Sequence, residues 1–126
     1  IGEGLIASGV PVKLMPLEGS HRSDVATEML DAGAILAGAP TMNNQLYPTM
    51  ADMMTYIKGL KPKPLVGAAF GSYGWSGESI KHLQQMLSDM KVDTVGEGLA
   101  VQYAPDDAAL KRCYDLGVAV AEKLAK

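Results

Sequence analysis

The sequence predicts one α/β domain, residues 1–126, in which helices alternate with the strands of a doubly wound parallel sheet. Residues 34–39 and 65–70 are apolar without alternation, as expected of strands covered on both faces. Segments with apolar residues at helical spacing precede and follow both runs. At 126 residues, 48% of them hydrophobic, the chain is long enough for one core and too short for two domains. This alternation indicates right-handed crossover units on a parallel sheet.

The first two elements predicted are the end of a helix and an edge strand. Residues 1–7 carry apolar side chains at helical spacing and are followed by a Ser-Gly pair. This pattern indicates a helix that begins upstream, in a longer polypeptide. Residues 10–14 have apolar side chains at alternate positions, which favours a strand exposed on one face. Because Pro11 cannot donate a ladder hydrogen bond, the strand is placed at the edge of the sheet.

A short helix and a central strand are predicted next. Ser23 and Asp24 are residue types that begin helices. Gly33 is placed to end this helix in a left-handed turn. The apolar run of residues 34–39 follows directly, and its lack of polar positions predicts a strand in the middle of the sheet.

Two amphipathic helices flank the second buried strand, residues 65–70. Pro48 suits the first turn of the earlier helix, and Gly59 ends it before a pair of prolines. The later helix follows the glycine-rich residues 71–77. The side chains predicted to face the sheet are Met50, Met53, Met54 and Ile57 from the first helix and Ile80, Leu83, Leu87 and Met90 from the second.

The chain is predicted to end with an interrupted strand and a helix. Residues 92–103 have an extended pattern, but Gly96 and Gly98 break it and predict either a bulge or a split into two strands. Pro105 and the two aspartates after it begin the helix. Its apolar stripe is predicted to be Leu110, Cys113, Tyr114, Gly117, Ala121 and Leu124.

Charge and composition exclude several classes of function. Eleven Lys and Arg against fourteen Asp and Glu give a net charge of −3 with no basic stripe, so nucleic-acid binding is not expected. No apolar run approaches the roughly 20 residues that a membrane-spanning helix needs. Cys113 is the only cysteine and cannot form an internal disulfide, and no secretory signal is recognisable. The expected compartment is therefore the cytoplasm.

Two loops are predicted to form a ligand site. Residues 40–45 follow the first buried strand and residues 71–77 the second, and open α/β sheets bind ligands beyond the carboxyl ends of their strands. The first loop offers hydroxyl and amide groups to the edge of a heterocycle. The second places Tyr73 and Trp75 among three glycines, which suits stacking on a flat ring. The alternatives are a polar turn for the first loop and, for the second, a turn whose aromatic rings cover its own core.

Other residues lack the pattern that their chemistry would need. Ser76 lies between a strand and a helix, but a nucleophile elbow requires glycine two residues later, where Glu78 stands. His21 and His82 have no ligand partner at metal spacing and are predicted to be surface residues. Residues 19–23 could hold a phosphate ahead of a helix, but they follow the edge strand and are predicted to be a solvent loop.

Both candidate loops resemble those of one protein family. Residues 39–44, Ala-Pro-Thr-Met-Asn-Asn, and residues 70–77, Phe-Gly-Ser-Tyr-Gly-Trp-Ser-Gly, are similar to the two flavin-contacting segments in the flavodoxin-like domain of flavodiiron proteins, also called A-type flavoproteins. The resemblance continues through residues 60–63 and 112–117, so it covers nearly the whole chain. Ordinary flavodoxins match both loops less well.

The resemblance implies a three-layer flavodoxin-like fold of strand order 2-1-3-4-5 that binds flavin mononucleotide (FMN). It places the Thr and Asn side chains of the first loop near the flavin edge and ribityl chain, and the Tyr-Gly-Trp segment of the second along the ring. No residue is implied to be catalytic or to bind a metal. The residues implied for FMN are Pro40, Thr41, Met42, Asn43, Asn44, Gly71, Ser72, Tyr73, Gly74, Trp75, Ser76 and Gly77.

The resemblance also implies a role in electron transfer. In the family, the domain passes single electrons from a rubredoxin, a reduced deazaflavin coenzyme or an NADH-linked reductase to a diiron domain that reduces oxygen or nitric oxide. The subunits form head-to-tail homodimers. This sequence contains no His-x-Glu-x-Asp-His run for the diiron domain, so iron is expected only outside it.

The family's first strand and the phosphate loop after it are also missing from this sequence. That strand would lie between residues 10–14 and 34–39, so the sheet is expected to lack strand 1 in this sequence. Either the segment exists outside the given residues, or another element fills its place. A phosphate is normally held by free N–H groups at the start of a helix. We therefore expect this chain to bind FMN more weakly than a chain that carries the loop.

Two other functions are left open by the sequence. One is a stand-alone flavin-dependent quinone or NAD(P)H oxidoreductase, and the other is a non-catalytic interaction domain that has lost FMN binding. A flavin absorbance spectrum separates the carrier and the enzyme from the interaction domain. Hydride uptake from a nicotinamide without a partner protein separates the enzyme from the carrier.

Overall fold

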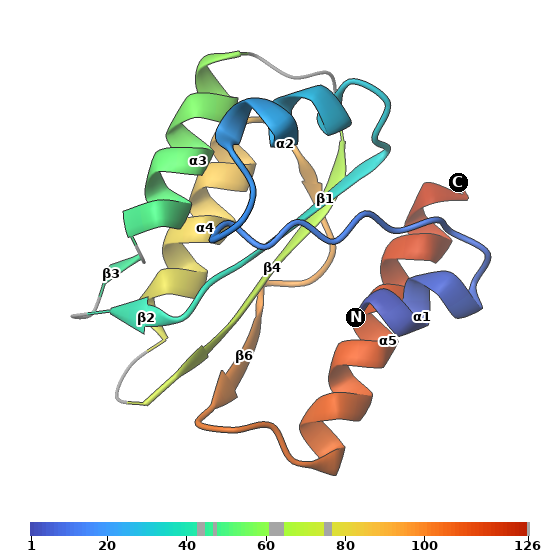
Figure 1. Cartoon of the computed structure of the whole chain (residues 1–126). Helices are drawn as coiled ribbons and strands as arrows, with labels where there is room; N and C mark the ends of the chain where they lie inside the picture. Colours follow the sequence, from blue (N-terminus) through green and yellow to red (C-terminus); the bar gives the residue numbers. More distant parts are fainter. Residues whose placement is uncertain (43–44, 47, 61–64, 75–76, 126) are drawn as a thin grey trace.

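Strands and helices alternate along the chain in a computed structural model that describes residues 1–42, 45–46, 48–60, 65–74 and 77–125 (Figure 1). This confirms the predicted α/β class. The elements are α1 (Gly2–Ala7), α2 (Arg22–Met29), β1 (Ala34–Gly38), β2 (Thr41–Met42), β3 (Gln45–Leu46), α3 (Pro48–Gly59), β4 (Val66–Tyr73), α4 (Glu78–Asp89), β5 (Asp93–Thr94), β6 (Leu99–Gln102) and α5 (Asp107–Leu124).

The strand β4 is the centre of the main sheet. It pairs in parallel with β1 along one edge, in a register that runs from Ala34 opposite Val66 to Gly38 opposite Phe70. Along its other edge it pairs in parallel with β5 and then with β6. The prediction that residues 34–39 form a central strand is therefore wrong for the part of the chain that the structure describes, where β1 pairs only with β4.

Residues 10–14 do not form the predicted edge strand. A strand is stabilised by its ladder of hydrogen bonds to a neighbour, and no described strand pairs with this segment. Two of the side chains on its alternating apolar face are exposed, Val12 at 39% and Leu14 at 84%. The apolar alternation is present, but a local pattern cannot supply the neighbour that the ladder requires.

Helices cover both faces of the sheet in three layers, with α2, α3 and α4 on one side and α1 and α5 on the other (Figure 1). Each face has its own apolar cluster. Because successive side chains of a strand point to opposite faces, Ala69 belongs to the cluster under α3 and α4 and Ala68 to the cluster under α1 and α5. Both alanines are fully buried, and their small side chains let the helices approach the sheet closely.

The helix α3 buries the four side chains that the sequence predicts, and α4 buries three of its predicted four together with Ser79. The exception, Met90, is half-buried. The interrupted strand is confirmed as a split into β5 and β6, with Gly96 at φ +72° and Gly98 at φ +105° between them. These left-handed positions favour glycine, which explains why the run breaks there.

Two helix ends show how side chains set element bounds. As predicted, α5 begins with Asp106 as its N-cap, and the carboxylate accepts a hydrogen bond of 2.8 Å from the Ala109 amide. The cap of α2 is His21, whose Nδ1 accepts a hydrogen bond of 3.1 Å from the Ser23 amide, so this helix begins one residue before the predicted start. Gly33 is not in a left-handed turn, because α2 already ends at Met29.

The helices α1 and α5 cross at two glycines, and this contact determines which face of α5 is buried. A Cβ added to Gly4 would collide with the Tyr114 carbonyl oxygen, and one added to Gly117 would collide with the Ile1 carbonyl oxygen. The predicted stripe of α5 is partly wrong, because Leu110 is 54% exposed and Tyr114 is 40% exposed. The buried residues of α5 are Ala109, Gly117, Val120 and Ala121.

Candidate functional site

The first candidate loop is more regular than the sequence predicts. After β1, Ala39 is buried and Pro40 is exposed, and the chain then forms the short antiparallel strands β2 and β3 in place of an irregular turn. Thr41 pairs with Leu46, and Met42 pairs with Gln45. The predicted site residues Asn43 and Asn44 lie outside the described residues. The helix α4 contacts both short strands, so the loop is anchored to the core of the domain.

The second candidate loop begins later than predicted. Gly71, Ser72 and Tyr73 belong to β4, where they pair with the last three residues of β6. A bend at Gly74 follows, and Gly77 is the N-cap of α4. The predicted site residues Trp75 and Ser76 lie outside the described residues. The reason for the correction is that β6 extends the ladder beyond the end of the apolar run.

The first loop starts beside Phe70 and Gly71 of β4, at the carboxyl edge of the sheet. The Ala39 amide donates a hydrogen bond of 3.3 Å to the Phe70 carbonyl oxygen. The Ala39 carbonyl oxygen lies where a Cβ of Gly71 would be, and it accepts a hydrogen bond of 3.4 Å from the Ser79 hydroxyl. This cluster, which we call the Ala39 junction, ties the end of β1, the extension of β4 and the first turn of α4 together.

The ring of Tyr73 packs within its own loop. Its Cδ1 atom lies 3.7 Å from the position that a Cβ of Gly77 would take, and the residue is half-buried. This arrangement agrees with the alternative in which an aromatic ring of the loop covers its own core. Stacking of the Tyr73-Gly74-Trp75 segment on a ligand stays a prediction.

The side chains of the two candidate loops are uncharged. Residues 40–46 and 71–77 contain no Asp, Glu, His, Lys, Arg or Cys. They offer hydroxyl and amide side chains, glycine backbone and aromatic rings. Loops without these residue types suit a cofactor that carries its own chemistry. The Ala39 junction supports the fit of a flat cofactor, because it brings the polar loop and the glycine-rich loop to one edge.

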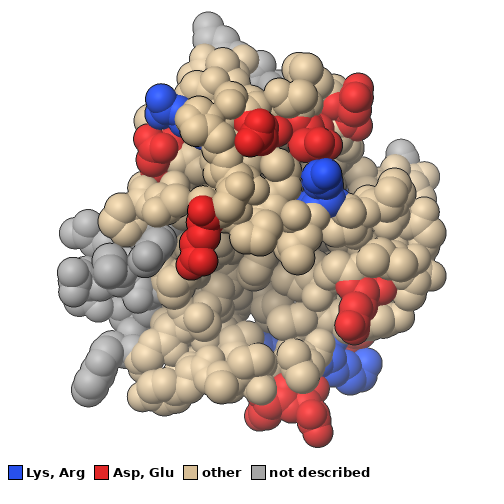
Figure 2. Space-filling model, in the orientation of Figure 1, with Lys and Arg blue, Asp and Glu red and all other residues tan. Residues whose placement is uncertain are grey.

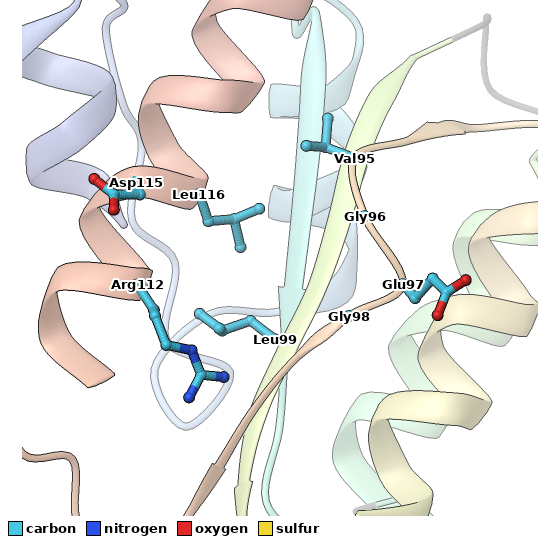
Figure 3. Close-up of a pocket in the computed structure, with 8 residues that line it drawn as sticks. All are labelled: Val95, Gly96, Glu97, Gly98, Leu99, Arg112, Asp115 and Leu116. Carbon is cyan, nitrogen blue, oxygen red and sulfur yellow. The ribbon is translucent and has the colours of Figure 1, made fainter. Parts of the chain in front are cut away.

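A cavity formed by described residues lies away from the two candidate loops. It has a volume of about 340 Å³ and is lined by residues of the β5–β6 connection and of α5. In Figure 3, Val95, Leu99 and Leu116 point toward one another, whereas Glu97 and Asp115 point away. The Arg112 guanidinium donates a hydrogen bond of 3.0 Å to the Ala100 carbonyl oxygen. The cavity includes none of the predicted site residues, and its walls are mainly apolar.

The face of the molecule in Figure 2 carries no concentrated charge of one sign. Figure 2 shows acidic side chains dispersed over one face, with only a few Lys and Arg and no broad basic area. Within the described ranges, no three His, Cys, Asp or Glu side chains gather closely enough to hold a metal ion. None of the described helices combines the length and apolar character needed to cross a membrane.

Sequence reasoning missed two contributors to this edge. Ser79 is fully buried and bonds to Ala39, and its spacing from Leu83 and Leu87 in α4 is a signal that could have placed it on the inner face. Gln102 donates a hydrogen bond of 3.3 Å to the Gly74 carbonyl oxygen. No local sequence pattern predicts that contact, because Gln102 and Gly74 are far apart in the sequence and are brought together by the pairing of β4 with β6.

Nearly the whole chain matches one known protein family. The family model described as flavodoxin matches residues 1–117. This chain belongs to the flavodoxin family. The predicted flavodoxin-like fold is thereby confirmed, and the order β1-β4-β6 agrees with the 3-4-5 part of the predicted strand order.

Individual relatives show which kinds of protein contain a domain similar to this flavodoxin domain. A nitric oxide reductase from Moorella thermoacetica is 44% identical over 124 residues, which are 98% of this chain and 31% of that protein. The structure of a rubredoxin oxygen:oxidoreductase from Desulfovibrio gigas superposes with a TM-score of 0.96 at 38% identity, again over 98% of this chain and 31% of that one. A flavodiiron protein from Giardia intestinalis gives a TM-score of 0.92 at 26% identity, over 98% and 31% of the two chains.

The flavodoxin domain described here therefore spans 31% of the length of these relatives. The predicted resemblance to the flavodoxin-like part of flavodiiron proteins is confirmed, because the match covers nearly all of this chain and a minor part of each relative. The residues assigned to FMN stay a prediction, and the arrangement of the Ala39 junction is the structural observation that bears on them.

Proposed function

We propose that this chain is an FMN-binding electron-transfer domain of a flavodiiron protein, which passes electrons from a redox partner to a diiron site outside these residues. The observation that carries the proposal is the Ala39 junction, where the loop after β1 starts beside Phe70 and Gly71 of β4, the strand that leads into the second loop. The flavodoxin family and the flavodiiron relatives support the same assignment.

The residues of the two loops suit the separate parts of FMN. The hydroxyl and amide groups of Thr41, Asn43 and Asn44 can exchange hydrogen bonds with the polar edge of the ring and with the ribityl chain. Gly71, Gly74 and Gly77 carry no side chain of their own, so the backbone of this segment can lie close to a flat ring. When bound, FMN supplies the redox chemistry, and the protein contributes binding and orientation.

The partners and the final reaction belong to the same proposal. The name of the Desulfovibrio gigas relative links that protein to rubredoxin and oxygen, and the name of the Moorella relative links that one to nitric oxide. We accordingly propose a rubredoxin, a deazaflavin coenzyme or an NADH-linked reductase as donor, and oxygen or nitric oxide as the acceptor reduced at the diiron site. A homodimer and a cytoplasmic location complete the proposal.

Replacing Trp75 by alanine tests the flavin assignment. We expect the dissociation constant for FMN to rise about tenfold or more, because stacking of an aromatic side chain on a base contributes roughly 1–3 kcal/mol. The midpoint potential of the bound flavin is expected to shift as well. Titration of flavin fluorescence measures the affinity, and a redox titration followed by absorbance measures the potential.

The matched control is Tyr114→Ala, which removes a 40% exposed aromatic side chain from α5 on the other side of the sheet. It should leave both values unchanged. Equal affinity and potential in Trp75→Ala and the unaltered chain would assign Trp75 a structural role. An unaltered chain that binds no FMN would refute the proposed function and favour an interaction domain.

A further inference from the structure

Tyr103 has a backbone conformation that its position in the fold does not explain. Its φ is +58°, in the left-handed region that bulky side chains rarely adopt. The other described non-glycine residue with positive φ, Lys91, follows the last turn of α4, where a left-handed residue commonly ends a helix. Tyr103 instead follows directly after β6, at the same edge of the sheet as the second candidate loop.

Burial does not account for this conformation either. The residue is 67% exposed, so little apolar area is removed from water in return for the strain. Strained residues persist where the surrounding structure holds them, and they concentrate at functional sites. The contacts of Tyr103 are therefore the feature to explain.

Three contacts connect residues 102–103 to the start of the second loop. The Tyr103 amide donates a hydrogen bond of 2.7 Å to the Tyr73 carbonyl oxygen. The Tyr103 ring atom Cε1 lies 3.5 Å from the position that a Cβ of Gly74 would take. The Gln102 side chain donates its hydrogen bond of 3.3 Å to the Gly74 carbonyl oxygen. Together these contacts fix one side of Gly74.

We infer that Tyr103 is a positioning residue for the second loop, which it holds ready for FMN through Gly74. The inference rests on the proposed function. The ring of Tyr103 covers Gly74 from the side of β6, while the Ala39 junction holds the same strand from the side of β1. Gly74 is thus held from the side of β6 and Gly71 from the side of β1, and Tyr103 makes its contact with Gly74 while in the left-handed backbone conformation.

The physical benefit is preorganisation. When a loop becomes ordered only as a ligand binds, the free energy needed to order it weakens the binding. Contacts that already order the loop in the free protein reduce this cost. In this account, the strain at Tyr103 lowers the stability of the free protein and improves the binding of FMN. Stability and affinity should therefore respond in opposite directions when the strain and the ring are removed together.

The decisive variant is Tyr103→Gly in the full chain, because glycine adopts positive φ without strain and carries no ring. We expect its melting temperature to rise by about 2–4 °C. We expect its dissociation constant for FMN to rise about three- to tenfold. Tyr103→Phe, which keeps the ring, should match the unaltered chain in affinity. Gln102→Ala should weaken FMN binding in the same direction as Tyr103→Gly, since it removes the hydrogen bond to Gly74.

Each outcome decides between two accounts of Tyr103. Unchanged affinity in Tyr103→Gly would overturn the inference, and a lower melting temperature together with weaker binding would show a merely structural residue. Hydrogen exchange of residues 71–74 without FMN gives a readout that needs no ligand, and it should become faster in Tyr103→Gly. If the unaltered chain binds no FMN, the proposed function fails, whereas unchanged exchange in Tyr103→Gly contradicts the contacts on which the inference depends.

Discussion

Replacing Gly71 by alanine is expected to lower the free energy of unfolding by about 2–3 kcal/mol and to weaken FMN binding more than tenfold. The added Cβ would collide with the Ala39 carbonyl oxygen and would lie 3.4 Å from the Ile80 side chain. The carbonyl belongs to the backbone and also accepts the Ser79 hydrogen bond, so it cannot move without opening the Ala39 junction. Urea denaturation and titration of FMN fluorescence measure the two effects.

A matched control for this substitution is Gly59→Ala. Gly59 is the last residue of α3, and among the described residues outside α3 and the chain neighbours of Gly59 no atom lies within 4 Å of the position of its added Cβ. In Gly59→Ala the free energy of unfolding should rise by less than about 1 kcal/mol, because alanine is a better helix former than glycine. If Gly71→Ala kept full stability and full affinity, the two loops would not depend on the close approach described here.

Gly117→Ala is expected to destabilise the protein by about 3 kcal/mol. The new Cβ would collide with the Ile1 carbonyl oxygen and would lie 3.0 Å from the Leu5 amide nitrogen, and both atoms belong to the backbone of α1. The crossing of α1 over α5 would have to open and expose Leu5 and Val120, which lie in the cluster beneath it. Thermal unfolding monitored by circular dichroism measures the loss.

The companion substitution is Gly2→Ala at the beginning of the same crossing helix. The nearest atom to its added Cβ, in the Val12 side chain, is at 3.8 Å, an ordinary contact. The melting temperature should therefore stay within about 2 °C of the unaltered value. If Gly117→Ala lowered the melting temperature less than Gly2→Ala does, the close crossing of α1 over α5 would be contradicted. Below its transition Gly117→Ala should retain FMN affinity, because α1 and α5 lie on the face of the sheet away from α4.

Local patterns predict most of the elements, because the spacing of apolar side chains reflects contacts within one helix or one strand. The inner face of α3 is an example, since all four of its predicted side chains are buried. The predicted edge strand at residues 10–14 shows the limit. Its alternation is present in the sequence, but a strand also needs a neighbour to accept its hydrogen bonds, and pairing is not a local property.

The sequence likewise predicts part of the candidate site, and the remaining contacts depend on strand pairing. Glycine, amide and aromatic residues mark both loops in the sequence, and the parallel pairing of β1 with β4 brings their first residues together. The contacts of Gln102 and Tyr103 with Gly74 arise from the pairing of β4 with β6. Residues near 103 carry no motif that points to residue 74, so only the structure reveals them.

The location of bound FMN tests the account most directly. Adding FMN to isotopically labelled protein and following amide resonances by NMR shows which backbone groups the cofactor affects. The account predicts the largest changes at Gly71, Gly74 and Gly77 and in residues 41–46, at the edge formed by the Ala39 junction. Changes confined to the cavity lined by Val95, Leu99 and Leu116, or no changes at saturating FMN, would contradict it.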